Sequence, residues 1–417
     1  MQDYPASARC EHKSTTKNSG RPAIEFQCEL GPRNVGTKNT MLAFIGIEKK
    51  RNRRSLMSIA AMSYEQAKRV LDSQVMELFE FAFPESCVDK HGCLTRCMQK
   101  LKNISNVCLW PEWRGINFID AAEMYPVPSR AETTGRTEQY VGSWLKQQAR
   151  DKAIMATKAT GPARSLSWIR EGQLNFSKVN LRQALEGSLK RLQTDYVDLY
   201  QLHWPDRNTP MFGGYHFDPK QERETVPLRE TLETLAEFIK EGKVRAWGPS
   251  NETPWGLMNY LRLADELGLP RPVSVQNAYS LLNRTWENGL AEIGFREKVS
   301  LLAYSPLGFG FLTGKYLKDP RSPGRANLFS DFAQRYKKPN TAKVVAAYVD
   351  LAEQHGLTPT QLSLAFVYHR WCVGSTIIGA TSMAQLQENL DAADVTLSPV
   401  VLQAIERIHL EYPNPAP

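Results

Sequence analysis

The stretch Gly115-Ile-Asn-Phe-Ile-Asp120-Ala-Ala-Glu-Met-Tyr125 opens the part of the chain from which a fold can be predicted. It begins with a short apolar run that ends at a carboxylate. Six further apolar runs follow, at 154–156, 197–202, 244–247, 273–275, 301–304 and 376–378. Amphipathic segments at helical spacing separate them, for example the leucine stripe in 181–192. Short apolar strands that alternate with helices are typical of parallel βαβ units, whose strands are buried on both faces.

Nearly every predicted strand ends in polar or aromatic side chains. These residues are Asp120, Lys158, His203, Ser250-Asn251, Gln276-Asn277 and Tyr304-Ser305. An open doubly wound sheet and a barrel both fit the alternation, but a barrel gathers its site from the carboxyl ends of many strands. Polar residues that merely begin loops would account for Ser and Asn, and account poorly for Asp, Lys and His at three successive strand ends. We therefore expect an α/β fold, an (α/β)8 barrel, with seven of its strands after Gly115.

Four of these polar residues fit one chemistry: Asp120, Tyr125, Lys158 and His203. Protonating a carbonyl oxygen at neutral pH requires an acid, and a phenol serves only if its pKa is lowered from about 10. A nearby ammonium favours phenolate, a carboxylate holds that ammonium charged and in place, and a histidine can orient the carbonyl. Each residue alone has a structural interpretation, such as an Asp–Lys ion pair or a core tyrosine. The four together, in this order, predict a catalytic group.

Several segments resemble the aldo-keto reductases, and the similarity is closer to the Tas-like branch of that family. The segments are 115–125, Thr157-Lys158, 188–200, Leu202-His203-Trp204-Pro205, 276–284 and 303–310. The resemblance runs from Gly115 to the C-terminus. It implies an (α/β)8 barrel that reduces aldehydes or ketones to alcohols with NADPH. It also implies that Asp120, Tyr125, Lys158 and His203 are catalytic, with Tyr125 as the general acid.

The resemblance further implies a cofactor site. Ser250, Asn251 and Gln276 would hold the nicotinamide carboxamide, and Tyr304 would stack on the nicotinamide ring. The residues implied at the pyrophosphate and the 2′-phosphate are Ser305, Leu307, Gly308, Thr313, Gly314, Lys315 and Arg325. Those implied at the adenosine end are Gly379, Thr381, Gln385, Glu388 and Asn389. A helix N-terminus with two cations suits a dianionic phosphate. Gly308-x-Gly310 lacks the third glycine of a Rossmann fingerprint, which makes that alternative weak.

Residues 1–114 depart from the family pattern, because nothing before Gly115 matches a first strand with its glycine-rich loop. We expect residues 1–63 to be a basic, disordered segment, residues 64–83 to form a helix that resembles the first barrel helix, and residues 84–114 to be an insertion that forms a mobile loop. Residues 115–417 would form the barrel. Either residues 40–47 supply the missing strand or its place stays open. The lack of a glycine-rich loop after 40–47 favours the open place.

Composition and charge exclude other classes. The chain has 417 residues and a formal net charge of +8, but residues 1–114 hold 18 Lys+Arg against 12 Asp+Glu, and the rest is nearly neutral. A nucleic-acid enzyme would carry that charge on its working domain. Apolar runs fall short of the roughly 18 to 20 residues of a membrane helix, so we expect a soluble protein without membrane or nucleic-acid partners.

The cysteines indicate where the protein works. Six of the seven cysteines precede residue 115, and an odd count without a secretory signal points to a reducing compartment. We expect a cytoplasmic protein, and the basic N-terminal segment leaves an organelle such as a plastid open. The spacing of Cys87, Cys93 and Cys97, with His91 nearby, lacks the paired Cys-x-x-Cys of zinc modules, so no metal is expected.

Two alternatives to an active reductase come from other classes. A catalytically weak barrel that binds NADPH as a redox sensor or regulatory subunit is motivated by the missing first strand. A retaining glycosidase requires two facing carboxylates at strand ends, and Asp120 alone qualifies. We expect a monomeric reductase that acts on a small carbonyl compound. Its loop 204–226 carries Trp204, Phe212, Tyr215 and Phe217, which indicate an apolar or aromatic pocket.

Overall fold

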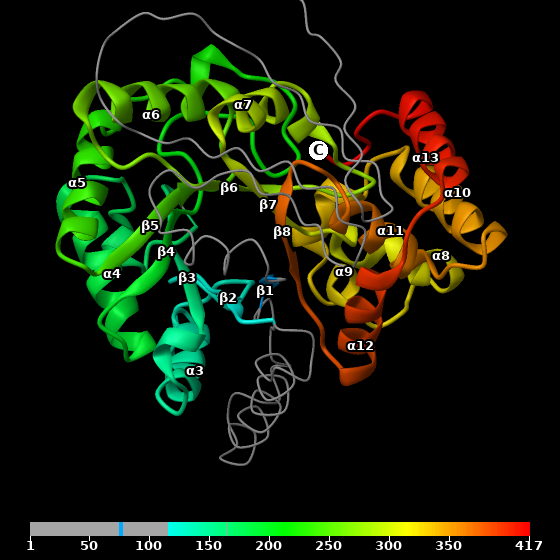
Figure 1. Ribbon diagram of the computed structural model, residues 1–417, viewed down its shortest axis with the longest axis horizontal. Helices are drawn as coiled ribbons and strands as arrows, with labels where there is room; N and C mark the ends of the chain where they lie inside the picture. Colours follow the sequence, from blue (N-terminus) through cyan, green and yellow to red (C-terminus); the bar gives the residue numbers. More distant parts are fainter. Residues whose placement is uncertain (1–74, 78–115, 164) are drawn as a thin grey trace, which may run out of the picture. The chain divides into compact units, whose positions relative to one another are not determined.

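The computed structural model describes residues 75–77, 116–163 and 165–417 (Figure 1). The expected disordered segment 1–63, the candidate strand at 40–47 and the insertion 84–114, with Cys87, His91, Cys93 and Cys97, lie outside these residues. Within the described part of the chain, no helix has both the length and the apolar character that crossing a membrane requires.

Eight parallel strands form one sheet in the order β5-β4-β3-β2-β1-β8-β7-β6 (Figure 1). The strands are β1 (Val75–Glu77), β2 (Phe118–Asp120), β3 (Ile154–Ala159), β4 (Val197–Leu202), β5 (Val244–Pro249), β6 (Ser274–Ala278), β7 (Ser300–Tyr304) and β8 (Val373–Ile378). The outermost strands of this order, β5 and β6, meet through a parallel bridge between Ser250 and Gln276. In addition, the Val273 N–H donates to the Trp247 carbonyl at 3.0 Å. The predicted (α/β)8 barrel is confirmed.

Strand β1 corrects two expectations about the N-terminal part. Val75 pairs with Phe118 of β2 and with Ile377 of β8, so a strand stands where we expected an open place. The helix predicted over 64–83 is wrong at Val75–Glu77, and its other residues lie outside the described ranges. The apolar spacing in 70–79 suits a helical face, but the unpaired edges of β2 and β8 favour a strand between them. Long-range pairing overrides a local pattern in this segment.

Helices follow most of the strands and cover the outside of the sheet (Figure 1). The helices are α3 (Arg136–Leu145), α4 (Lys178–Leu192), α5 (Leu228–Lys240), α6 (Pro254–Leu267), α7 (Leu290–Glu297), α8 (Lys315–Lys318), α9 (Arg325–Leu328), α10 (Thr341–Gln354), α11 (Pro359–Tyr368), α12 (Met383–Asp391) and α13 (Pro399–Glu411). The 3-10 segments are η3 (Arg150–Lys152), η4 (Arg170–Gly172), η5 (Pro219–Gln221), η6 (Thr285–Glu287), η7 (Gly308–Thr313), η8 (Ser330–Tyr336) and η9 (Ala392–Asp394).

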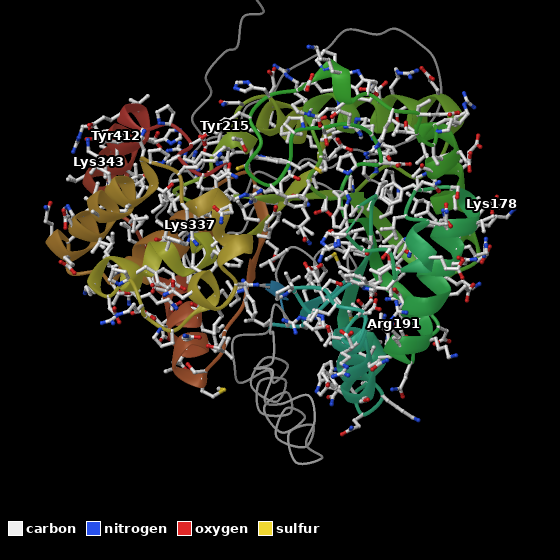
Figure 2. The ribbon with its side chains drawn as sticks, turned by 180° about the vertical axis from the view of Figure 1, so that it is seen from behind. Lys178, Arg191, Tyr215, Lys337, Lys343 and Tyr412 are labelled. Carbon is white, nitrogen blue, oxygen red and sulfur yellow. The ribbon has the colours of Figure 1, made fainter. Side chains whose placement is uncertain are left out.

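Local sequence explains where several of these helices begin. The Thr253 side chain accepts a hydrogen bond from the Gly256 N–H, and Pro254 fills the first turn of α6. Thr358 and Gln361 form a reciprocal capping box at the start of α11. Outward-facing side chains also pair between helices: the Lys343 ammonium of α10 lies 4.6 Å from the ring centre of Tyr412, which caps α13 (Figure 2). These contacts fix the outer layer without reaching the strands.

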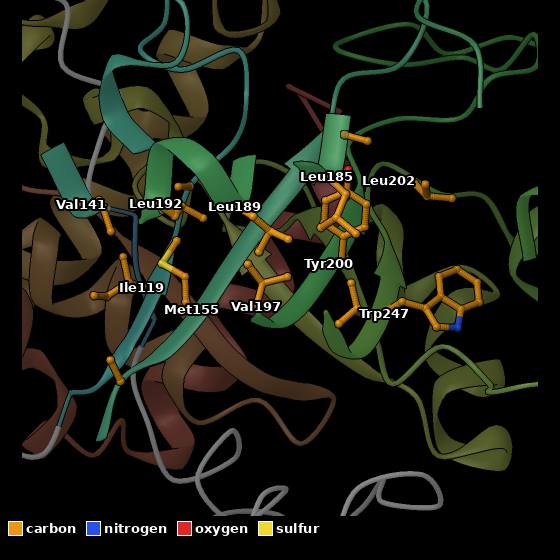
Figure 3. Close-up of a cluster of buried hydrophobic side chains, with 14 of the residues drawn as sticks. Ile119, Val141, Met155, Leu185, Leu189, Leu192, Val197, Tyr200, Leu202 and Trp247 are labelled. Carbon is orange, nitrogen blue, oxygen red and sulfur yellow. The ribbon is translucent and has the colours of Figure 1, made fainter. Parts of the chain in front are cut away.

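The outer core lies between the strands and the helices, and Figure 3 shows part of it around α3 and α4. The leucine stripe of α4 is buried, as its spacing predicts, at Leu181, Leu185, Leu189 and Leu192. Gly142 of α3 lies against the backbone of Leu192, where an added Cβ would come within 2.8 Å of its Cα. The two helices therefore pack closely because one of them carries a glycine at the contact.

The barrel interior consists of an apolar layer with a polar layer above it. The apolar layer comes from six strands and contains Phe118, Ile154, Ala156, Leu199, Ala246, Leu302 and Ile377. Side chains of a strand alternate between its two faces, so the residue two positions later points the same way. Two positions after Phe118, Ala156 and Leu199 come Asp120, Lys158 and Gln201, all fully buried. The strand register therefore places polar groups at the carboxyl end of the barrel, where barrel enzymes carry their sites.

Candidate active site

Asp120 and Lys158 form a fully buried ion pair at the carboxyl end of the barrel. The Lys158 ammonium also donates to the Ala121 carbonyl at 3.0 Å. The second carboxylate oxygen of Asp120 accepts from the Gln201 amide at 2.8 Å and from the Gln276 amide at 3.1 Å. Both charges are therefore compensated and hydrogen-bonded, as burial of an ion pair requires.

Tyr125 lies next to this pair on the loop that follows β2. Its backbone N–H donates to the Ala122 carbonyl at 3.1 Å and its carbonyl accepts from the Gly135 N–H at 3.0 Å, which fixes the loop on both sides. The Lys158 ammonium is 4.9 Å from the centre of the Tyr125 ring. A positive charge at this distance stabilises the negative charge that a phenol acquires when it gives up its proton.

His203 follows β4 and completes the group. Its ring lies edge-on to the Tyr125 ring, with the centroids 5.5 Å apart. Burial, together with the positive charge of Lys158, holds the pKa of His203 well below its usual value, so the imidazole is neutral at neutral pH. Among the described residues, no group hydrogen-bonds its buried Nδ1 atom. A neutral imidazole can still donate a hydrogen bond to an oxygen atom of a ligand.

A cavity of 690 Å³ opens above these residues. Tyr125 and His203 line it together with Ser250, Asn251, Gln276 and Tyr304. Part of its wall is aromatic, since Trp204, Phe212, Phe309 and Tyr336 also line it. The aromatic character predicted for loop 204–226 thus reaches the cavity through Trp204 and Phe212, whereas Tyr215 and Phe217 do not line it and are more than half exposed.

Hydrogen bonds link several of the residues expected beside a nicotinamide. The Tyr304 hydroxyl donates to the Asn251 side-chain oxygen at 2.6 Å, and the Asn251 amide donates to the His203 carbonyl at 2.8 Å. The Ser250 hydroxyl donates to the Gln276 carbonyl at 2.7 Å. Asn251 has a positive φ of 53°, which Asn tolerates better than most residues. These contacts fix one wall of the cavity at the ends of β5, β6 and β7.

A second cavity of 410 Å³ adjoins the first, because Ser305 and Phe309 line both. Most residues expected at the phosphates and the adenosine line it: Ser305, Leu307, Thr313, Lys315, Arg325, Gly379, Thr381, Gln385, Glu388 and Asn389. Gly308 and Gly314 do not line it; both have positive φ, and Gly314 ends η7. Two cations and the N-terminus of α12 suit an anionic ligand, so the donor set fits a dinucleotide.

Burial lowers the pKa of Lys315, whose ammonium donates to the Pro323 carbonyl at 3.2 Å. The Arg325 guanidinium lies 4.4 Å from the centre of the Phe309 ring. At the adenosine end, the Thr381 hydroxyl and N–H both donate to the Gln385 side-chain oxygen, at 2.7 and 2.8 Å. Lys315, Thr381 and Gln385 thus have local hydrogen-bond partners and lie on loops and short helices.

Sequence reasoning missed several residues of the site, among them Gln201 and Arg335. Gln201 bonds Asp120, and strand alternation could have found it, because it lies two positions before His203 in β4. Arg335 lines the larger cavity from η8, and no local pattern announces it.

Comparison with known proteins identifies related chains. The sequence model of the Aldo/keto reductase family matches residues 113–409. "Protein tas" of Escherichia coli (strain K12) is 53% identical over 307 residues, which cover 73% of this chain and 88% of that protein. An "Aldo-keto reductase" of Babesia bovis is 38% identical over 279 residues, covering 63% and 98%. An "NADH-specific methylglyoxal reductase" of Escherichia coli (strain K12) is 30% identical over 311 residues, covering 70% and 85%.

Proposed function

This chain belongs to the aldo/keto reductase family, and from that premise we propose that it is an NADPH-dependent carbonyl reductase with Tyr125 as its general acid. The family makes it an oxidoreductase that uses a nicotinamide cofactor. The observation that carries the proposal is that Tyr125 and His203 line a cavity together with Tyr304 and Asn251, and that the buried Lys158 ammonium lies beside the Tyr125 ring.

A nicotinamide held beside Tyr304, Asn251 and Gln276 would supply hydride to the carbonyl carbon, and the residues of the chain would supply the proton. His203, neutral and buried, donates a hydrogen bond to the carbonyl oxygen and orients it. Tyr125 then transfers its phenolic proton to the same oxygen. The Lys158 ammonium stabilises the phenolate that remains, and Asp120 holds the ammonium in place through their buried ion pair.

The choice of NADPH rests on two cations in the smaller cavity. Lys315 and Arg325 line it, and a 2′-phosphate dianion would accept hydrogen bonds from both. One relative is named for NADH, so family membership does not set this choice. The preference is a property of these two side chains in our proposal.

We further propose that the protein works in the cytoplasm, as a monomer and without a nucleic-acid partner. The near-neutral charge of residues 115–417 supports the last point, since a basic working surface is the usual sign of nucleic-acid binding. The regulatory alternative was motivated by a missing first strand. Because β1 occupies that place, this alternative is not favoured.

The test replaces the acid and leaves its surroundings intact. Tyr125→Phe should lower carbonyl reduction by on the order of 10² to 10⁴ because general acid catalysis is lost. NADPH binding, followed by fluorescence titration, should change little. Tyr215→Phe is the matched control, because that hydroxyl donates to the Asn414 carbonyl and does not line the cavity. Full turnover by Tyr125→Phe would refute the assignment.

A further inference from the structure

Arg335 places a positive charge in the wall of the larger cavity. It belongs to η8, and its guanidinium hydrogen-bonds the phenol oxygens of Tyr304 and Tyr336, which line the same cavity. The guanidinium carbon also lies 5.9 Å from the centre of the Phe212 ring. Two phenols and an aromatic face therefore hold the side chain toward the space above Tyr125 and His203.

The partners of Arg335 differ from those of four other buried or partly buried arginines. Arg170, Arg191, Arg207 and Arg284 each form an ion pair with a glutamate. Among the side chains that the structure describes, which exclude those of residues 330–332, no carboxylate forms an ion pair with Arg335. An arginine guanidinium remains protonated in proteins, so Arg335 is charged at neutral pH while its two phenol partners are neutral. A charged guanidinium with neutral partners retains the capacity to bind an anion.

We propose that Arg335 binds a carboxylate of the substrate, so that the preferred substrates are aromatic aldehydes or ketones that carry a carboxylate. This inference rests on the proposed function, because the same cavity contains Tyr125 and His203. The aromatic walls at Trp204, Phe212 and Phe309 supply the flat contacts that an aryl ring requires. The fork of donors in a guanidinium matches the two oxygens of a carboxylate.

The position of Arg335 distinguishes it from the cations expected at the cofactor. Lys315 and Arg325 line the smaller cavity, whereas Arg335 lines the larger one and not the smaller. The two cavities thus have separate positive charges. A contact between Arg335 and the cofactor through Tyr304 is the competing explanation, and the experiment separates the two.

The experiment compares 4-carboxybenzaldehyde with its methyl ester, which keeps the ring and the aldehyde and removes the charge. The unmodified protein should have a higher kcat/KM for the acid. Arg335→Gln should lower kcat/KM for the acid by about 10-fold to 10²-fold, mainly through KM, because a hydrogen-bonded charge pair is lost. The ester should change by less than about threefold. Arg335→Lys, which keeps the charge and loses the fork, should retain part of the preference.

Lys338→Gln is the matched control for loss of a nearby charge. The Lys338 ammonium donates to the Gly213 carbonyl at 2.7 Å and does not line the cavity. Its replacement should change the ratio of kcat/KM for the acid to kcat/KM for the ester by less than about twofold.

Three outcomes would overturn the proposal. These are equal kcat/KM for acid and ester in the unmodified protein, an equal loss for both substrates in Arg335→Gln, and weaker NADPH binding as the main effect of that variant. The comparison of acid and ester in the unmodified protein needs no variant, so it tests the proposal even if Arg335→Gln does not fold.

A binding measurement separates this proposal from the proposed function. Calorimetric titration with 4-(hydroxymethyl)benzoate reports carboxylate binding without turnover. Binding that is kept in Tyr125→Phe and lost in Arg335→Gln supports the carboxylate site. The same result with no reduction of either aldehyde would refute the reductase and leave the site standing, whereas binding that Arg335→Gln leaves unchanged would refute the site.

Discussion

The ends of β2, β3 and β4 and the loops after β7 and β8 form two regions of one barrel mouth, and they are built differently. In the first region, Asp120 and Lys158 are fully buried and each makes several hydrogen bonds. In the second, Lys315 and Arg325 stand on helices of four residues, α8 and α9, and are partly exposed. Strands hold the ion pair that would support the acid Tyr125, and short loop elements hold the groups that would bind phosphate.

This difference has a physical reason. Proton transfer demands that the reacting groups be placed to within a fraction of an ångström. Here the buried ion pair on β2 and β3 and the backbone hydrogen bonds of the loop that carries Tyr125 supply that placement. Phosphate recognition tolerates movement, because an anion can be met by several N–H groups and cations at once. Positive φ values at Phe309, Gly310 and Gly314 show that the second region is a chain of tight turns. Substitutions in the first region should therefore lower the stability of the fold, and substitutions in the second should lower the affinity for the nucleotide.

The largest effect is expected from Lys158→Met. This change leaves the Asp120 carboxylate buried without its countercharge, and such losses cost about 3–5 kcal/mol. Urea unfolding would measure it. Lys178→Met is the matched control, since Lys178 pairs with Glu237 on the surface (Figure 2) and should lose less than about 1 kcal/mol. Equal losses of unfolding free energy in the two variants would show that the buried ion pair contributes no more to stability than the exposed one.

The double variant Lys315→Ala with Arg325→Ala tests the second region. It should remove most of the preference for NADPH over NADH, at about 1.5–3 kcal/mol for each charged hydrogen bond lost, and leave stability almost unchanged. Fluorescence titration with both nucleotides gives the affinities. Lys318→Ala with Arg321→Ala removes two cations that do not line the cavity, and serves as the control. An unmodified protein that binds both nucleotides equally would contradict the assignment.

Gln201→Leu sharpens the comparison within the first region. It removes one donor to Asp120 and one acceptor for Gln276 in a fully buried network, and should destabilise the fold by about 1–3 kcal/mol. Gln147→Leu alters an exposed glutamine that bonds the Ser143 carbonyl, and should cost less than about 0.5 kcal/mol. Unfolding curves that coincide for the two variants would show that the network adds nothing to stability.

The smallest effect is a pH dependence. His203 takes up its proton in the unfolded chain near pH 6.5, whereas its folded pKa lies well below this value. Its contribution to stability is thus complete above pH 6.5 and is lost as pH falls toward the folded pKa, by at most about 1.4 kcal/mol per pH unit. His203→Gln should unfold with a shallower pH slope below pH 6.5 and a parallel one above pH 7.5. Identical slopes on the acid side would show that the imidazole titrates normally when folded.

Much of the barrel could be predicted from residue patterns. Seven apolar runs mark β2 to β8, because strands buried on both faces must be apolar throughout. The same runs end at Asp120, Lys158 and His203, so strand order alone brings these residues to one end. Their roles, like those assigned to the cofactor residues, stay predictions until the variants are measured.

Two features could not be read from local sequence. β1 has three residues, and the reason it is a strand lies in the edges of β2 and β8 rather than in its own spacing. Arg335 reaches the cavity from η8, more than a hundred residues after His203, and only the folded chain brings it beside Tyr304. Sequence periodicity indicates which face of a strand or helix is buried. It does not indicate where in the fold an irregular segment such as η8 lies.

The stacking of a polar layer on an apolar layer inside the barrel has a consequence for how such proteins diverge. The buried Asp120–Lys158 pair lies on strands, while segment 204–212 after β4 and η8 contribute part of the cavity wall. Insertions and substitutions in those two segments can alter which compound fits without disturbing the buried charges below. Natural variation in substrate preference can therefore accumulate at the rim of the barrel while the catalysed reaction stays the same.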